Sequence, residues 1–213
     1  MDYTHLIEAL GEADVSKLHT STVSVVGLGG IGSTLAELLV RSGVNVRLVE
    51  KDRVYEEDLD RLSLFEHKHV SKFKATEAKK ILSRINPETT IKSFNEEINE
   101  QSLFLADADI VLDCSGDNDL TPLISKYCFE HNIPCIAGGI RDTKCLVITS
   151  SEKKSIMDQY DNLSLDRSEG LIPAATRIIA GMMYVKAVKI LTGREYDDKL
   201  LVYDVWTHSF VDA

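Results

Sequence analysis

A glycine-rich turn near the N-terminus constrains the possible folds of this chain more than any other feature. It reads Val25-Val26-Gly27-Leu28-Gly29-Gly30-Ile31-Gly32-Ser33, between a β-branched run at residues 22–26 and an amphipathic stretch at residues 31–42. The first pattern predicts a strand and the second a helix. A strand, a GxGxxG turn and a helix in this order open a βαβ unit, so we expect an α/β fold built on a parallel sheet.

The spacing of the glycines predicts a site for a phosphate group. Gly27 permits the tight turn, Gly29 lets the backbone approach the phosphate, and Gly32 lets the helix pack closely on the strand. Gly30 lies at the start of the helix, whose N-terminus offers backbone N–H groups to an anion. The alternative is a tight turn that binds no ligand.

An acidic residue, Glu50, ends the next predicted strand, which covers residues 44–50. In nucleotide-binding folds of this kind, a carboxylate at this position binds the ribose hydroxyls. The sequence therefore predicts a bound nucleotide, and these residues alone leave NAD and ATP open.

The rest of the chain continues the alternation of β-branched runs and amphipathic stretches, which is typical of further βαβ units. Strands are predicted at residues 90–94, 109–113, 133–137, 145–149 and 200–205, with 207–211 pairing with the last of them. Helices are predicted at residues 74–85, 120–131 and 174–191. The last of these is apolar almost all round, so we expect it to be buried. Residues 150–171 are long and polar, which is typical of a binding loop or a disordered excursion.

Length and composition indicate one globular domain over residues 1–213. The 213 residues are 44% hydrophobic and 27% charged, and a net charge of −10 disfavours binding to nucleic acid. No apolar run is long enough to span a membrane and the N-terminus lacks the order of a signal peptide, so we expect a cytoplasmic protein.

The cysteines and histidines show no metal-binding spacing. No CxxC pair is present, so we predict neither a disulfide framework nor a structural zinc site. The four cysteines fall on apolar positions and are expected in the core: Cys114, Cys128, Cys135 and Cys145. His67-Lys68-His69 has no third ligand and is expected to be a solvated face.

The segment after Glu50 distinguishes between the two nucleotides. It reads Lys51-Asp52-Arg53-Val54-Tyr55-Glu56-Glu57-Asp58-Leu59-Asp60-Arg61-Leu62, for which a dehydrogenase has no evident use. At this point the chain resembles the ThiF/MoeB/HesA superfamily of adenylyltransferases, which includes the ubiquitin-activating enzymes. The family's second strand ends in two acids, matched by Glu50 and Asp52. A following arginine that contacts the ATP phosphates is matched by Arg61, and a lysine that opens a helix is matched by Lys74.

Further motifs of this superfamily follow in the same order. Asp113-Cys114-Ser115-Gly116-Asp117-Asn118 is similar to the family's Asp-Asn pair after the fourth strand, which helps to hold the metal and the nucleotide. Asp117 matches the acid and Asn118 its neighbour. The resemblance extends from about Leu18 to the end of the chain.

The resemblance implies both a fold and an activity. The implied fold is a Rossmann-like, doubly wound α/β fold, with a mostly parallel sheet, late antiparallel strands and helices on both faces. The implied activity is ATP-dependent adenylation of the C-terminal carboxylate of a small ubiquitin-like or sulfur-carrier protein by a homodimer. Arg61, Lys74 and a Mg²⁺ ion near Asp117 would stabilise the charge that develops on the α-phosphate and on pyrophosphate. No general base is needed, because a carboxylate is already ionised at neutral pH.

The chain also departs from the family pattern. Asp58 and Leu62 replace a neutral amide and a hydrogen-bonding side chain around Arg61, and Gly116 adds one residue before Asp117. Tyr3 stands where many members carry an N-terminal arginine. The acidic replacement near Arg61 and the lack of a cysteine in residues 150–171 favour one alternative, a catalytically degenerate member acting as a structural or regulatory subunit. An NAD-dependent oxidoreductase is the other alternative, although no convincing proton-handling residue accompanies the glycine turn.

Overall fold

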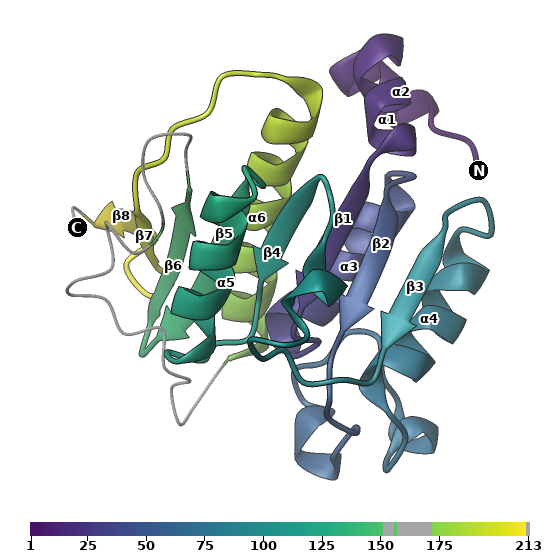
Figure 1. Cartoon of the computed structure of the whole chain (residues 1–213), viewed down its shortest axis with the longest axis vertical. Coiled ribbons are helices and arrows are strands. Elements are labelled where there is room, and N and C mark those ends of the chain that lie inside the picture. Colours follow the sequence, from purple (N-terminus) through teal and green to yellow (C-terminus); the bar gives the residue numbers. More distant parts are fainter. Residues whose placement is uncertain (151–155, 157–171, 212–213) are drawn as a thin grey trace.

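The computed structural model describes residues 1–150, 156 and 172–211. These residues form an eight-stranded sheet in the order β3-β2-β1-β4-β5-β6-β7-β8, with helices on both faces (Figure 1). The strands are β1 (Thr22–Val26), β2 (Asn45–Val49), β3 (Ile91–Phe94), β4 (Ile110–Asp113), β5 (Cys135–Arg141), β6 (Lys144–Thr149), β7 (Leu201–Asp204) and β8 (Ser209–Val211). The α-helices are α1 (Thr4–Leu10), α2 (Glu12–Thr20), α3 (Gly30–Arg41), α4 (Lys74–Ile85), α5 (Leu120–Glu130) and α6 (Pro173–Thr192). Three short 3-10 helices are η1 (Glu56–Asp58), η2 (His67–His69) and η3 (Leu103–Ala106).

The five strands from β3 to β5 are parallel, and β6, β7 and β8 extend the sheet in antiparallel fashion. Val25 on β1 is in register with Leu48 on β2 and with Leu112 on β4. The chain thus runs outwards from β1 to β3 and then returns to the other side of β1. Such a reversal leaves a crevice at the carboxyl ends of β1 and β4, where α/β sheets bind their ligands.

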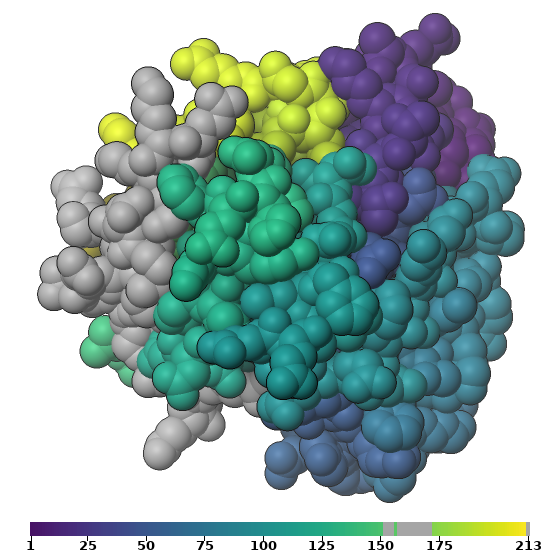
Figure 2. Space-filling model, in the orientation of Figure 1, coloured from purple at the N-terminus to yellow at the C-terminus, as the bar shows by residue number. Residues whose placement is uncertain are grey.

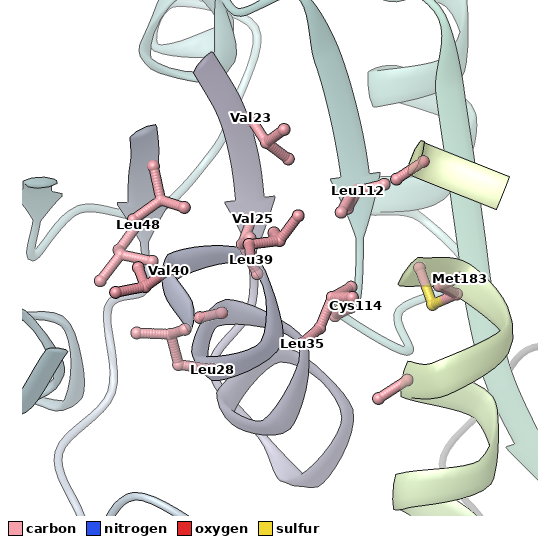
Figure 3. Packing of buried hydrophobic residues seen from close by; sticks show 14 of the residues in the cluster. Val23, Val25, Leu28, Leu35, Leu39, Val40, Leu48, Leu112, Cys114 and Met183 are labelled. Atoms are coloured by element: carbon pink, nitrogen blue, oxygen red, sulfur yellow. The ribbon is translucent and has the colours of Figure 1, made fainter. Parts of the chain in front are cut away.

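Successive side chains of the central strands supply two hydrophobic cores on opposite faces of the sheet. On one face Val25 and Leu112 pack with Leu35 of α3 and Met183 of α6 (Figure 3). On the other face Val26 and Val111 pack with α5 and η3. This period-two alternation explains why helices cover both faces.

The N-terminal helices adjoin the end of α6 at the top of the view in Figure 2. The Nζ atom of Lys17 on α2 donates a hydrogen bond to the carbonyl oxygen of Thr192, the last residue of α6, at 2.7 Å. Arg194 donates to a carboxylate oxygen of Asp14 at 3.0 Å. These contacts fix α2 against the end of α6.

The predicted α/β architecture is confirmed, including the late antiparallel strands. The strand at residues 22–26 and the helix at residues 74–85 have the predicted bounds. The helices α1 and α2 were not predicted, because α1 buries no residue and α2 buries only Val15 and Leu18, which is too few for a clear apolar period. Most of the expected binding loop at residues 150–171 lies outside the described residues.

Two expectations about burial need correction. His69 is not part of a solvated face: it is buried, and its Nδ1 accepts a hydrogen bond from the backbone N–H of Glu66 at 2.9 Å. His67, by contrast, is exposed. The helix α6 is not buried all round either, since Val185 is 54% exposed. Its apolar outer face does not pack on the sheet within the described residues.

The four cysteines are free and buried, as their apolar positions predicted. Within the part of the chain that the structure describes, no helix is long and apolar enough to cross a membrane.

Candidate nucleotide site

The glycine turn joins β1 to α3 at the carboxyl end of β1, where the strand order of the sheet reverses. Gly27 has a φ of +87°, and a Cβ atom there would lie 2.8 Å from the carbonyl oxygen of Cys114 at the end of β4. A Cβ atom on Gly32 would lie 1.9 Å from the carbonyl oxygen of Gly27. Neither position accepts a side chain, because the turn, α3 and β4 approach each other too closely.

The other two glycines differ in what surrounds them. A Cβ atom on Gly29 would meet nothing within 4 Å, so the turn is open there. A Cβ atom on Gly30 would lie 2.7 Å from the Cγ2 atom of Thr176, near the start of α6. Gly30 therefore allows α6 to pack on α3, and the open side at Gly29 leaves room for a phosphate beside the N-terminus of α3.

Glu50 connects the glycine turn to the end of β2. Its Oε2 atom accepts a hydrogen bond from the backbone N–H of Leu28 at 2.8 Å, and its Oε1 atom accepts one from the N–H of Asp52 at 2.9 Å. Glu50 is only 8% exposed. The carboxylate predicted to bind ribose thus also holds the turn in place.

A cavity of about 330 Å³ opens at the carboxyl ends of β1, β2 and β4, next to the glycine turn. Apolar side chains form one wall of the cavity: Val26, Val49, Ile98, Leu120 and Leu123. Acidic residues surround it: Glu50, Asp52, Glu96, Glu97, Glu100, Asp117 and Asp119. An apolar wall with polar groups at its edge is typical of a small-molecule site.

Among the residues that the structure describes, Lys51 is the one basic residue that lines this cavity. Its ammonium group forms an ion pair with Glu97. The hydrogen bond to Glu97, with the nearby charges of Asp52 and Asp117, raises the pKa of Lys51 above its ordinary value. Lys51 therefore stays charged at neutral pH and partly offsets the acidic edge of the cavity.

Arg61 and Lys74, the two cations that the family resemblance indicated, are brought together by a third residue, Asp58. The Oδ1 atom of Asp58 is 2.8 Å from Nη2 of Arg61, and its Oδ2 atom is 3.0 Å from Nζ of Lys74. The backbone N–H of Lys74 donates to the carbonyl oxygen of Asp52 at 3.0 Å, which links this cluster to the cavity wall. Asp58, Arg61 and Lys74 form a compact group that we call the cation cluster.

The ion pairs of Asp58 were not predicted from the sequence. The signal that could have revealed the pair with Arg61 is their separation of three residues, which places side chains on the same side of a helical turn. The pair with Lys74 depends on how the segment folds back, so no local pattern could indicate it.

Asp117 lies at the mouth of the cavity in the turn between β4 and α5. Its Oδ1 atom accepts hydrogen bonds from the backbone N–H groups of Asp119 at 2.9 Å and Leu120 at 3.1 Å. Gly116, the extra residue in this turn, has a φ of +58°. Asp117 thus stabilises the start of α5, and its exposed carboxylate still faces the cavity. Asn118 is half-buried in the same turn.

Asp113, the last residue of β4, stabilises the same turn through hydrogen bonds. This buried carboxylate accepts hydrogen bonds from the hydroxyls of Ser115 at 2.6 Å and Thr121 at 2.5 Å. Burial raises the pKa of Asp113, and the hydrogen bonds from Ser115 and Thr121 oppose that effect. Asp113 therefore fixes the position of the Asp117 turn.

Tyr3 lies far from this site. Its hydroxyl accepts a hydrogen bond from Nδ2 of Asn86 at 2.7 Å, and its ring contacts His19. Asn86 in turn donates to the carbonyl oxygen of Val40, near the end of α3. Tyr3 packs at the opposite end of α3 from the glycine turn, where it has no contact with the cavity.

A cavity at the point where the strand order reverses, next to a glycine-rich turn between a strand and a helix, is the arrangement typical of α/β proteins that bind nucleotides. The sequence profile of the ThiF family matches residues 3–213, so the chain belongs to the ThiF family.

Named relatives agree with this assignment. Molybdopterin-synthase adenylyltransferase of Escherichia coli (strain K12) is 27% identical over 205 residues, which cover 91% of this chain and 82% of that enzyme. Sulfur carrier protein ThiS adenylyltransferase of Bacillus subtilis (strain 168) is 25% identical over 212 residues, which cover 94% of this chain and 63% of that enzyme.

Solved structures show the same fold. The crystal structure of E. coli MccB has a TM-score of 0.87 at 19% identity, over 98% of this chain and 68% of that one. The complex of E. coli MccB with ATP has a TM-score of 0.81 at 19% identity, over 93% of this chain and 65% of that one. These likenesses confirm the predicted Rossmann-like arrangement.

Proposed function

We propose that this chain uses ATP to adenylate the C-terminal carboxylate of a small ubiquitin-like or sulfur-carrier protein. Its relatives are named as adenylyltransferases, one of them for a sulfur carrier protein. A further relative is a SUMO-activating enzyme subunit, 28% identical over 64% of this chain and 21% of its own length. The observation that carries the proposal is the cation cluster of Arg61 and Lys74, which the backbone N–H of Lys74 connects to Asp52 in the lining of the cavity.

The site suits each part of ATP. The apolar wall of the cavity accepts the base, the carboxylates of Glu50 and Asp52 lie where ribose hydroxyls bind, and the α3 N-terminus accepts phosphate oxygens. The phosphates then extend towards Arg61 and Lys74. Because guanidinium and ammonium groups bind phosphate oxygens strongly, these two side chains are the expected clamp.

The chemistry follows from this arrangement. A carboxylate oxygen of the carrier attacks the α-phosphorus, the bond to the bridging oxygen breaks, and the electron pair leaves with pyrophosphate. Arg61 and Lys74 stabilise the negative charge that develops on the phosphates. No proton is transferred from the carboxylate, since it is already ionised.

The residues at the cavity also fit a magnesium ion. Mg²⁺ commonly binds one or two carboxylates together with substrate phosphates, and Asp117 presents an exposed carboxylate at the cavity mouth. The described residues contain no preformed group of three or more metal-binding side chains. When bound, the ion would neutralise phosphate charge, and Asp117 would hold it.

We further propose that residues 1–213 act as one adenylation domain in a cytoplasmic homodimer. Four free, buried thiols suit a reducing compartment. A groove of about 440 Å³ on α6, lined by Ile178, Met182 and Leu201, adjoins the exposed side chain of Val185. This apolar surface is a suitable place for a second copy of the chain.

An ATP–pyrophosphate exchange assay tests the proposed function. The purified protein is incubated with Mg²⁺, ATP and labelled pyrophosphate, with and without each small carrier protein of the same genome. We expect exchange that requires one carrier and that falls by roughly 100-fold or more in Arg61→Ala and in Lys74→Ala. Bound ATP without exchange for any carrier would instead support the subunit without catalytic activity, and binding of NAD in place of ATP would support the oxidoreductase.

A further inference from the structure

Asp58 is the buried anion of the cation cluster, and the function described above gives it no role. Its side chain is 6% exposed, compared with 7% for Lys74 and 25% for Arg61. We propose that Asp58 sets the affinity of the site for polyphosphate, by competing with the phosphates for Arg61 and Lys74. This inference rests on the proposed function, because that function places the phosphates at these two side chains.

Both carboxylate oxygens of Asp58 accept hydrogen bonds from N–H donors. Oδ1 accepts from Nη2 of Arg61, and Oδ2 accepts from Nζ of Lys74 and from the backbone N–H of Tyr55 at 3.1 Å. A single anion therefore holds both cations. A phosphate group offers the same oxygen chemistry to the same donors.

Asp58 cannot easily move away when a phosphate arrives. The N–H of Tyr55 fixes its carboxylate, and its backbone belongs to η1, where its carbonyl oxygen accepts from the N–H groups of Arg61 and Leu62. Leu62 is buried in the core, so this backbone is anchored.

Arg61 is the most exposed member of the cluster. It already donates to the carbonyl oxygen of Glu57 at 2.7 Å and to Asp60 at 3.1 Å, so other acceptors are within its reach. A bound polyphosphate must therefore share the two cations with a fixed, buried carboxylate.

A fixed anion at this position discriminates by phosphate charge. The repulsion between Asp58 and the ligand acts through a poorly solvated region, where charges interact more strongly than in water. The penalty is greatest for a triphosphate, smaller for a diphosphate and absent for a nucleoside. Asp58 consequently limits the affinity for ATP while leaving the binding of adenosine unchanged.

The test removes the negative charge of Asp58 and keeps a side-chain oxygen that can accept the hydrogen bond from the N–H of Tyr55. Asp58→Asn retains a carbonyl oxygen that can accept from the N–H of Tyr55, and Asp58→Ser offers a hydroxyl for the same contact. The control is Asp60→Asn, which removes the same charge from the same segment and from a contact with the same arginine. The difference is that Asp60 is 67% exposed and screened by water.

Isothermal titration calorimetry measures the affinity of each protein for ATP, ADP, adenosine and inorganic triphosphate. We expect Asp58→Asn and Asp58→Ser to bind ATP and inorganic triphosphate about tenfold or more tightly than the wild type, with a smaller gain for ADP. Adenosine affinity stays within about twofold, as do all affinities of Asp60→Asn. In the exchange assay the KM for ATP falls without a matching rise in kcat.

If both Asp58 variants bind inorganic triphosphate as tightly as the wild type or more weakly, the proposal is overturned. Asp58 then has only a structural role, through its hydrogen bond with the N–H of Tyr55. Inorganic triphosphate separates this result from failure of the proposed function. If no form of the protein binds ATP, the proposed function fails, and the response of inorganic triphosphate to the Asp58 substitutions still decides whether this residue controls the two cations.

Discussion

Gly29 and Gly32 lie three residues apart in the glycine turn, but their surroundings differ. Gly32 is required for packing, because a Cβ atom there would overlap the carbonyl oxygen of Gly27. Gly29 is not required for packing, because a Cβ atom there would meet nothing within 4 Å. Gly32 is therefore needed for the fold, whereas Gly29 leaves the turn open at the proposed phosphate site.

This separation can be measured with two alanine variants. We expect Gly32→Ala to lower the free energy of unfolding by roughly 1–3 kcal/mol, because the turn must shift to admit the methyl group. Gly29→Ala should change stability by no more than about 0.5 kcal/mol and still weaken ATP binding, since the methyl group narrows the approach of the phosphate. Urea unfolding and ATP titration of both variants provide the test, which fails if Gly29→Ala binds ATP as the wild type does.

His69 couples the stability of the fold to pH. Burial, followed by the charge of Lys68, lowers the pKa of His69 below its ordinary value of 6.5. Between pH 6.5 and the lowered pKa, the imidazole of His69 is protonated in the unfolded chain and neutral in the folded protein. Stability is therefore lost as the pH falls through 6.5 towards the lowered pKa, by about 1.4 kcal/mol for each pKa unit of difference.

The variant His69→Asn isolates this contribution, because its amide oxygen can accept the same hydrogen bond from Glu66 without titrating. Urea unfolding between pH 7 and pH 5 should show a steeper loss of stability for the wild type than for the variant. Parallel curves for the two proteins would mean that His69 is not the group responsible.

Among the elements, α6 packs on both β5 and α3 and so connects the strand β5 with the helix that follows the glycine turn. A Cβ atom on Gly138 of β5 would lie 2.3 Å from the sulfur of Met183, so the helix rests directly on the strand. Met183 is fully buried, whereas Val185 on the same helix is 54% exposed. The inner face of α6 thus belongs to the core, and its outer face does not.

Two truncations on α6 should therefore differ in their cost. Met183→Ala is expected to lower the free energy of unfolding by about 2–5 kcal/mol, because it leaves a cavity between α6 and β5. Val185→Ala is expected to stay within about 0.5 kcal/mol in the monomer. Chemical denaturation at low protein concentration measures both, and a similar loss for the two variants would contradict this placement of the helix.

The elements that the sequence predicted best are those whose patterns are local. The β-branched run of β1 and the amphipathic period of α4 are complete within a few residues, and both elements have the predicted bounds. β5 runs beyond the predicted residue 137, through Gly138 and Gly139 to Arg141. Glycines favour strands weakly, and pairing with β6 together with contact from α6 extends this strand.

The candidate site shows the same division between local and tertiary information. The glycine turn and the acid after β2 follow from spacing, because each is fixed by one strand-to-helix connection. The burial of His69 and the contact between Asp58 and Lys74 arise from the way residues 50–74 fold back on themselves. The resemblance to a family indicated Arg61 and Lys74, but it could not indicate a contact that departs from the family pattern.

At the scale of the whole molecule, the sheet places residues from distant parts of the chain around one cavity. β1 supplies the glycine turn, β2 leads to Glu50 and Asp52, and β4 leads to the Asp117 turn. The crevice exists because the strand order reverses at β1 and β4, as doubly wound sheets require. We propose that this crevice joins AMP to the carboxyl end of a protein tail.

Intact-mass spectrometry of the acceptor detects this transfer of AMP. A tail peptide with a free C-terminal carboxylate, taken from the carrier that supports exchange, is incubated with the protein, ATP and Mg²⁺, and the same peptide with an amidated C-terminus serves as the control. We expect a mass increase of one AMP group on the free peptide, none on the amidated peptide, and none with Arg61→Ala. ATP binding without any AMP adduct on the free peptide, or an adduct on the amidated peptide, would contradict the proposal.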